Sequence, residues 1–250
     1  MTTTLYLGDC LDILPTLPAQ SVEAIITDLP YGTTACKWDE IIPFAPMWEQ
    51  VKRILKPRGV FVTTASQPFT SKLVMSNLGW FKYELVWGKS QGSSPGLANI
   101  RPMPAHENIL VFGGANSTYN PQMREGFAAW KRVETGRKLK NEHGYGYKNN
   151  PGYTKRGGET RYPLSVISVH YQKGNNQQQH PTQKPVALYE YLIRTYTNEG
   201  DTVLDICAGS GTTGVAAVNA GRNCILIEKE RPYFEIIQRR IAEAQPCLMP

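Results

Sequence analysis

The segment Asp28-Leu29-Pro30-Tyr31 combines a carboxylate, a turn and an aromatic ring directly after the apolar run of residues 22–27. That run has the length and composition of a buried strand, and ligands of open α/β sheets bind beyond the carboxyl ends of strands. The ring can stack on a flat heterocycle, while the carboxylate and the turn carbonyls can accept hydrogen bonds from an exocyclic amino group. We interpret the segment as a catalytic site for chemistry on a nucleobase amino group. An ordinary strand-ending turn is the alternative interpretation.

A second candidate site is the glycine loop of residues 209–214, which has the spacing G-x-G-x-x-G and follows a strand expected at residues 201–206. Glycines let the backbone approach a ligand closely, and the N-terminus of the following helix favours a negative group. Glu228 ends the next expected strand and can accept hydrogen bonds from both hydroxyls of a ribose. Taken alone, this arrangement fits either NAD or S-adenosylmethionine.

The elements that must position these two sites alternate between strand and helix along the chain. The expected strands are residues 3–7, 22–27, 60–65, 81–87, 108–112, 201–206 and 223–227. The expected helices are one that ends near residue 17, and then 42–55, 68–78, 186–196, 213–220 and 233–244. This alternation predicts an α/β fold.

The chain order of the two candidate sites argues against a dehydrogenase. Only 22 residues follow Glu228, which is too few for the further strands and helices that a dinucleotide-binding sheet requires. Strands from the N-terminal half must therefore complete the sheet, so that the cofactor half is C-terminal and the Asp28 half is N-terminal.

Regular periodicity is lost over residues 114–180, and we predict that this stretch is a functional insertion. Between Arg124 and Arg161, ten basic residues and four acidic ones give a net charge of +6, which equals the charge of the whole chain. Tyrosines and glycines are interleaved with the basic residues. Cations for phosphates together with aromatic and amide groups for bases are typical of a nucleic-acid surface. A solvated basic loop is the alternative interpretation.

Composition and length bound the remaining possibilities. A chain of 250 residues with 41% hydrophobic residues fits one large domain with an insertion. The five cysteines form no CxxC pair and no zinc-like cluster with histidine, so we expect free thiols and no metal site. No apolar run reaches the roughly 18 residues of a membrane span, and the N-terminus has no signal-like stretch. We therefore expect a cytoplasmic protein with no membrane partner.

The order of these motifs resembles that of the β-class amino-group DNA methyltransferases, the adenine-N6/cytosine-N4 family with a DPPY-type motif. The resemblance covers nearly the whole chain outside the insertion, and the matching residues are Gly8-Asp9-Cys10, Asp28-Leu29-Pro30-Tyr31 with Trp38, His180-Pro181-Thr182-Gln183-Lys184-Pro185, and Asp205 through Thr213 with Glu228. It implies a Rossmann-like methyltransferase fold: a seven-stranded, mostly parallel sheet with helices on both faces and a circularly permuted motif order. Residues 1–113 would form the catalytic half, 114–180 the target-recognition insertion and 181–250 the cofactor-binding half.

The resemblance also implies residue roles. The catalytic residues would be Asp28, Leu29, Pro30 and Tyr31. The cofactor, S-adenosylmethionine, would be bound by Asp9, Cys10, Thr182, Lys184, Asp205, Cys207, Ala208, Gly209, Ser210, Gly211, Thr212 and Glu228. Within this set, Thr182 and Lys184 would hold the methionine carboxylate, and Glu228 would hold the ribose. Double-stranded DNA would be contacted by Lys131, Arg132, Arg137, Lys138, Lys140, Lys148, Lys155 and Arg156.

The implied activity is site-specific methylation of adenine at N6, on a base flipped out of the duplex, by a homodimer of prokaryotic or phage type such as those of restriction–modification systems. An aspartate at the head of the catalytic motif favours adenine, because serine is more usual in cytosine-N4 enzymes. Two positions depart from the commoner pattern: Leu29 stands in place of a proline, and Cys207 in place of a phenylalanine. We expect activity to survive with leucine at position 29. We expect the affinity for the cofactor to depend on the residue at position 207. The alternatives are a cytosine-N4 enzyme, a non-catalytic DNA-binding relative, and a methyltransferase acting on RNA or protein.

Overall fold

The computed structural model describes residues 1–34, 36, 39–89, 91–93, 95–126, 159–169 and 183–244. Contacts divide the chain into two compact units, the first formed by Met1–Asn120 with Leu164–Pro250 and the second by Pro121–Pro163. In the second unit, Arg124 and Arg161 form an antiparallel bridge with N···O distances of 2.8 and 2.9 Å. All helices and strands named below belong to the first unit.

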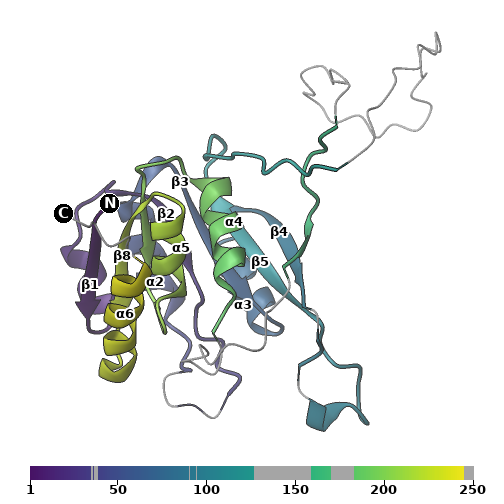
Figure 1. Cartoon of the computed structure of the whole chain (residues 1–250). Helices are drawn as coiled ribbons and strands as arrows, with labels where there is room; N and C mark the ends of the chain where they lie inside the picture. The colour runs from purple at the N-terminus through teal and green to yellow at the C-terminus, as the bar shows by residue number, and fades with distance from the viewer. Residues whose placement is uncertain are drawn as a thin grey trace. The chain divides into compact units, whose positions relative to one another are not determined.

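In the described residues, the first unit is built on an eight-stranded sheet with the order β1-β8-β7-β2-β3-β5-β4-β6 (Figure 1). The strands are β1 (Thr3–Leu7), β2 (Val22–Thr27), β3 (Leu55–Ala65), β4 (Phe81–Gly88), β5 (His106–Gly113), β6 (Val166–Ser168), β7 (Thr202–Asp205) and β8 (Asn223–Glu228). Neighbouring strands from β1 to β3 are parallel, β5 is antiparallel to both β3 and β4, and β6 is parallel to β4. The predicted α/β class and the mostly parallel sheet are confirmed, with one strand more than expected.

The additional strand is β6, which lies within the stretch predicted to be an insertion. It pairs in register with the end of β4, Val86 opposite Val166. Its middle residue, Ile167, is buried while its two neighbours are exposed. Three residues are too few to give a recognisable period, so sequence patterning does not detect this strand.

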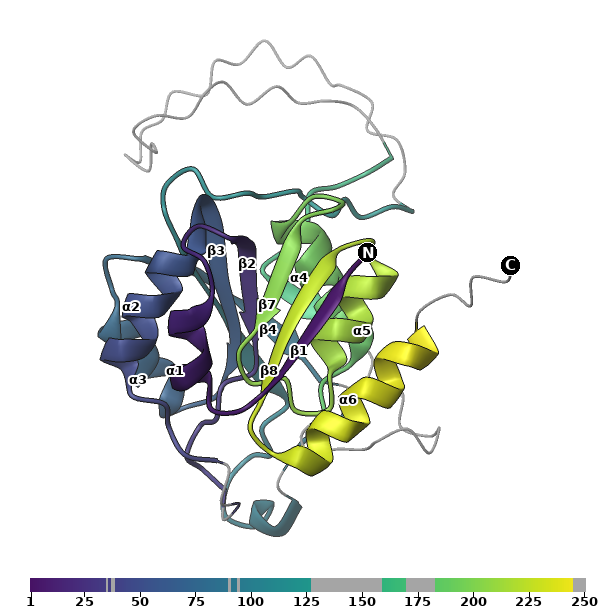
Figure 2. The same cartoon turned by 90° about the vertical axis from the view of Figure 1, so that its left-hand side faces the viewer.

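Helices cover both faces of the sheet, as expected. They are α1 (Cys10–Ile13), α2 (Phe44–Ile54), α3 (Phe69–Ser76), α4 (Val186–Tyr196), α5 (Thr212–Asn219) and α6 (Arg231–Ala244), with short 3-10 turns η1 (Leu14–Thr16) and η2 (Pro95–Leu97). Figure 2 shows α1, α2 and α3 on one side of the strands and α4, α5 and α6 on the other.

Two apolar cores follow from this layering, because successive strand residues point to opposite faces. Ile25 of β2 belongs to the core beneath α1, α2 and α3, whereas Ala24 and Ile26 belong to the core beneath α4, α5 and α6. The second core requires Gly214 in α5, since a Cβ atom there would lie 2.6 Å from side-chain atoms of both Ile241 and Leu226. The glycine therefore allows α5 to pack closely against α6 and β8.

Most predicted boundaries differ from the observed ones by one or two residues, but the start of β3 differs by five. The stretch Lys56-Pro57-Arg58-Gly59 reads as a turn after a helix, yet the structure places it in β3, which begins at Leu55. The ladder with β2 shifts its register between Val22 and Ala24, so the pairing of the two strands is irregular over this stretch.

Among the described residues, no helix combines the length and the apolar character needed to cross a membrane.

Candidate active site

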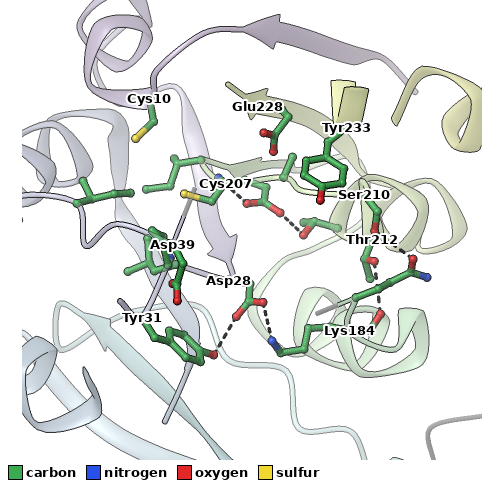
Figure 3. A pocket seen from close by; sticks show the side chains of 18 of the residues that line it. Cys10, Asp28, Tyr31, Asp39, Lys184, Cys207, Ser210, Thr212, Glu228 and Tyr233 are labelled. Carbon is green, nitrogen blue, oxygen red and sulfur yellow. Dashed lines mark hydrogen bonds and ion pairs between the residues drawn. The ribbon is translucent and has the colours of Figure 1, made fainter. Parts of the chain in front are cut away.

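A cavity of about 770 Å³ lies where β2 and β7 end side by side in the middle of the sheet (Figure 3). From this point β8 and β1 extend in one direction and β3, β5 and β4 in the other. Ligands of open α/β sheets bind at such a reversal of strand order. The predicted site residues that line the cavity are Asp9, Cys10, Asp28, Leu29, Pro30, Tyr31, Lys184, Asp205, Cys207, Ala208, Ser210, Thr212 and Glu228.

Several predicted site residues are not among the lining residues. Gly209 and Gly211 belong to the loop that carries the lining residues Ala208, Ser210 and Thr212. Thr182 and Trp38 lie outside the described residues, as do the eight predicted DNA contacts, Lys131, Arg132, Arg137, Lys138, Lys140, Lys148, Lys155 and Arg156.

Asp28 follows the last residue of β2 and is held by three hydrogen-bond donors. Its Oδ1 accepts from the Tyr31 hydroxyl at 2.9 Å, and its Oδ2 lies 2.5 Å from Lys184 Nζ (Figure 3). Oδ1 also accepts from the Thr64 hydroxyl. A carboxylate has about four lone-pair sites, so one remains for a ligand. The side chain is 24% exposed, and it lines the cavity, where that lone pair can be used.

Lys184 lies between two carboxylates rather than at an open position. Its Nζ is 3.5 Å from Glu107 Oε2 in addition to its contact with Asp28, and its side chain is 9% exposed. Burial lowers the pKa of this ammonium, but the charges of Asp28 and Glu107 outweigh burial and raise it above its usual value. Lys184 is therefore charged, and its nearest described partners are these two acids.

The Tyr31 ring is held by packing as well as by its hydroxyl. It stacks on Phe69 with ring centroids 5.2 Å apart and an angle of 25° between the planes. Burial, followed by the negative charges of Asp28 and Glu107, raises the pKa of the phenol well above its usual value. The hydroxyl therefore remains a neutral donor to Asp28.

Asp205, the last residue of β7, ties the glycine loop to the sheet. Its carboxylate accepts hydrogen bonds from the Thr27 hydroxyl at 2.6 Å, from the Cys207 backbone N–H at 3.0 Å and from the Thr213 hydroxyl. Burial raises its pKa to about 6 despite these three donors. One buried carboxylate thus joins β2, the loop after β7 and the start of α5.

Glu228, the last residue of β8, holds the turn of the glycine loop. Its Oε2 accepts from the Gly209 backbone N–H at 2.7 Å and its Oε1 from that of Glu230 at 2.8 Å. Burial raises the pKa of Glu228, and these two amides partly offset that rise. Gly211 has a φ of 79°, and a Cβ there would lie 3.1 Å from Ile237, so both backbone and packing require glycine.

The other residues predicted to bind the cofactor have mainly local contacts. Asp9 caps α1 by accepting a hydrogen bond from the Leu11 backbone N–H at 2.8 Å. The Ser210 hydroxyl donates to Gln183 Oε1 at 3.3 Å, and Arg240 donates to the Ser210 carbonyl at 2.6 Å. A hydrogen bond with Cys10, followed by burial, raises the pKa of the Cys207 thiol well above its usual value. Within the described part of the chain, no three His, Cys, Asp or Glu side chains gather as potential ligands of a metal ion.

The structure adds polar residues that sequence analysis missed. Glu107 and Lys89 line the cavity from the adjoining ends of β5 and β4, and they form an ion pair. Each is a charged residue at one end of an apolar strand, and this pattern in the sequence could have identified both residues as candidates. The Asp28 donor Thr64 lies among apolar β3 residues and carries no such signal.

Asp39 is a further missed residue, and it shapes the loop that follows Tyr31. Its carboxylate accepts hydrogen bonds from the backbone N–H groups of Gly32, Thr33 and Thr34 at 2.9, 2.9 and 2.7 Å. Burial raises the pKa of Asp39, but the bonds from Thr34 and the backbone amides outweigh burial and lower it. Asp39 therefore lines the cavity as a charged group that fixes the backbone of residues 32–34.

Comparison with known proteins identifies the family. A family model for N6/N4 methyltransferases, described as DNA methylase, matches residues 22–239. The type II methyltransferase M.HpaI of Haemophilus parainfluenzae is 29% identical over 260 residues, which cover 96% of this chain and 74% of that protein. The type II methyltransferase M.HinfI of Haemophilus influenzae is 27% identical over 276 residues, which cover 97% of this chain and 69% of that protein.

Solved structures show the same fold. The M1.HpyAVI–SAM complex aligns with a TM-score of 0.63 and 24% identity, covering 96% of this chain and 99% of that one. PvuII DNA methyltransferase, which is cytosine-N4-specific, aligns with a TM-score of 0.70 and 20% identity, covering 96% of this chain and 86% of that one. The family match spans most of the chain and includes both the Asp28 segment and the glycine loop, which confirms the resemblance that the motifs indicated. This chain belongs to the N6/N4 family of DNA methylases.

Proposed function

We propose that this protein transfers the methyl group of S-adenosylmethionine to the N6 amino group of an adenine flipped out of duplex DNA. The observation that carries the proposal is that one cavity contains Asp28 after β2, Asp205 at the end of β7 and Glu228 at the end of β8. The carboxylate that we propose for the amino group and the one that we propose for the ribose thus line the same cavity.

The residues present fit S-adenosylmethionine. The cavity volume of about 770 Å³ lies within the range of small-molecule sites, roughly 300–1,000 Å³. We propose that Glu228 binds the ribose hydroxyls and that the loop of Gly209, Ser210 and Gly211 surrounds the methionine part. When bound, this cofactor supplies an electrophilic methyl group.

The protein's contribution to the chemistry is positioning. The amino group of the base is a poor nucleophile because its lone pair is delocalised into the ring. Hydrogen bonds to the free lone pair of Asp28 and to the Leu29 carbonyl would draw that nitrogen toward tetrahedral geometry and align it for in-line transfer. The nitrogen loses one proton as it gains the methyl group, and the Asp28 carboxylate can accept that proton.

Lys184 has a second possible role in this scheme. The resemblance assigns it to the methionine carboxylate, whereas its described contacts are with Asp28 and Glu107. A lysine ammonium has three donors, so a third contact is compatible with the two observed ones. We keep the carboxylate role as part of the proposal, together with Thr182.

The choice of adenine rests on the aspartate that heads the catalytic segment. The alternative, a cytosine-N4 enzyme, is favoured by the structural likeness to the cytosine-N4-specific PvuII enzyme. Duplex DNA as the substrate is supported by the net charge of +6 between Arg124 and Arg161. The proposal also includes a homodimer as the active form, which the family resemblance implies.

Asp28→Ala tests the role of the catalytic carboxylate. We expect it to abolish methyl transfer and to leave the affinity for S-adenosylmethionine nearly unchanged, because Lys184 retains Glu107 as a counter-charge. Transfer of a tritiated methyl group to DNA and calorimetric titration of the cofactor measure the two properties separately. Asp12→Ala, an exposed acid of α1, is the matched control and should retain both. Equal loss of transfer and cofactor binding would mean that Asp28 is structural.

A further inference from the structure

Glu107 is a second carboxylate in the proposed methyl-transfer site, and neither the motifs nor the family assignment gives it a role. It is the second residue of β5, it is 8% exposed, and it lines the same cavity as Asp28. An acid buried to this degree is stable when it is paired, so its partners indicate what it does.

The partners of Glu107 are largely those of Asp28. Its Oε2 lies 3.5 Å from Lys184 Nζ and 3.5 Å from the Tyr31 hydroxyl, while Asp28 contacts the same ammonium and the same phenol. The Oε1 atom of Glu107 forms an ion pair with Lys89 at the end of β4. Two carboxylates and two ammonium groups therefore form one cluster with no net charge.

We propose that Glu107 is a positioning residue for methyl transfer, which balances Lys89 and Lys184 so that Asp28 stays available to the amino group of the base. This inference rests on the proposed function. Without the charge of Glu107, Lys89 would lose the carboxylate with which it pairs, and Asp28 would be the one described carboxylate left beside Lys184. Lys184 would then compete with the base for the lone pairs of Asp28.

The same charge matters for the reaction itself. Methyl transfer moves positive charge from the sulfonium to the amino nitrogen, next to Asp28. An excess ammonium charge in the cluster would oppose that movement, and partly buried charges are screened little by salt. Glu107 keeps the cluster neutral before the positive charge arrives, whereas its glutamine analogue would leave the cluster with a net charge of +1.

The first test is Glu107→Gln, which removes the charge and keeps the shape. For a positive charge that moves from roughly 9 Å to roughly 6 Å from one unbalanced ammonium charge, at an effective dielectric constant of about 20, we expect kcat to fall roughly fivefold. The Kd for S-adenosylmethionine should stay within about threefold, because the predicted ribose ligand Glu228 and the loop anchor Asp205 have other partners. Glu84→Gln, an exposed acid of β4 that accepts a hydrogen bond from Asn108, is the matched control and should retain kcat.

The second test separates charge balance from a merely structural role. The double variant Glu107→Gln with Lys89→Gln restores a neutral cluster, and we expect it to recover most of the lost kcat. A structural role for Glu107 would give no recovery, because the second substitution removes a further contact. If Glu107→Gln alone fails to fold, the kcat of the double variant is compared with that of the wild type instead. The double variant retains one ammonium group, that of Lys184, and one carboxylate, that of Asp28.

Three outcomes decide the matter. Loss of kcat in Glu107→Gln with recovery in the double variant supports the proposal. A kcat for Glu107→Gln equal to that of an active wild type, or a double variant no better than the single one, overturns the role of Glu107 alone. Absence of DNA methylation by the wild-type protein overturns the proposed function, and this inference with it.

Discussion

Replacing Thr213 with valine removes one hydrogen bond from the buried Asp205 carboxylate and keeps the shape of the side chain. Burial raises the pKa of Asp205 to about 6, whereas an aspartate in the unfolded chain has a pKa of about 3.9. The folded state therefore binds the proton more tightly, and stability decreases as pH rises from about 4 to 6, by about 3 kcal/mol in all. The hydroxyl of Thr213 limits that loss by donating to the charged carboxylate.

The expected effect of Thr213→Val depends on pH. At pH 8 Asp205 is charged, and a hydrogen bond to a charged group contributes roughly 1.5–3 kcal/mol. At pH 5 most of Asp205 is protonated, and a neutral hydrogen bond contributes roughly 0.5–1.5 kcal/mol. We expect the variant to lower the free energy of unfolding by about 2 kcal/mol at pH 8 and by about 1 kcal/mol at pH 5.

Thr195→Val is the matched control, because the Thr195 hydroxyl is equally buried but donates to a neutral acceptor, the Tyr191 carbonyl, at 2.7 Å. Its effect should be the same at both pH values. Urea unfolding followed by tryptophan fluorescence at pH 5 and pH 8 measures both variants. An equal loss at the two pH values for Thr213→Val, or a larger loss at pH 5, would refute the assignment of a charged, buried Asp205 at neutral pH.

Three further predictions concern Asp39, the basic insertion and the glycine loop. Asp39→Asn should lower Tm by several degrees at pH 7 and by less at pH 3, since a lowered pKa means that the stabilisation by the charged form is complete above about pH 4 and decreases as pH falls toward the folded-state pKa; equal shifts in thermal scans would contradict this. Lys138→Glu with Lys140→Glu should weaken DNA binding at low salt, with a difference that fades as salt rises, as filter binding can show; unchanged binding would remove the insertion's role. Gly211→Ala should lower the free energy of unfolding by roughly 1 kcal/mol and weaken the binding of S-adenosylmethionine several-fold in calorimetric titration. An unchanged affinity would mean that the glycine loop does not bind the cofactor.

Features with a local signal were predictable from the sequence. The helix expected at residues 186–196 is α4 with the same bounds, because its apolar residues recur at helical spacing. Asp28 and Glu228 could be placed because each directly follows the apolar run of an expected strand, whereas Asp205 was placed through the family resemblance. Parallel strands present their carboxyl ends at one edge, and the structure brings these three carboxylates into one cavity there.

Features that depend on distant contacts were not predictable. Lys184 lies 156 positions from Asp28, and only the assembled sheet shows that the two residues pair. The roles of Glu107 and Lys89 follow from the pairing of β4 with β5, and the sequence gives no register for that pairing. Thr64 is one of two adjacent threonines in β3, and only the fold shows which hydroxyl reaches Asp28.

Incubation with labelled S-adenosylmethionine and unmethylated DNA, followed by enzymatic digestion and nucleoside chromatography, tests the central claim most directly. Asp28→Ala protein supplies the background. The account predicts label in N6-methyladenine with the wild-type protein and none with the variant. Label in N4-methylcytosine would contradict the assigned base while leaving the positioning chemistry of Asp28 intact, and the absence of label from DNA would contradict the proposed function as a whole.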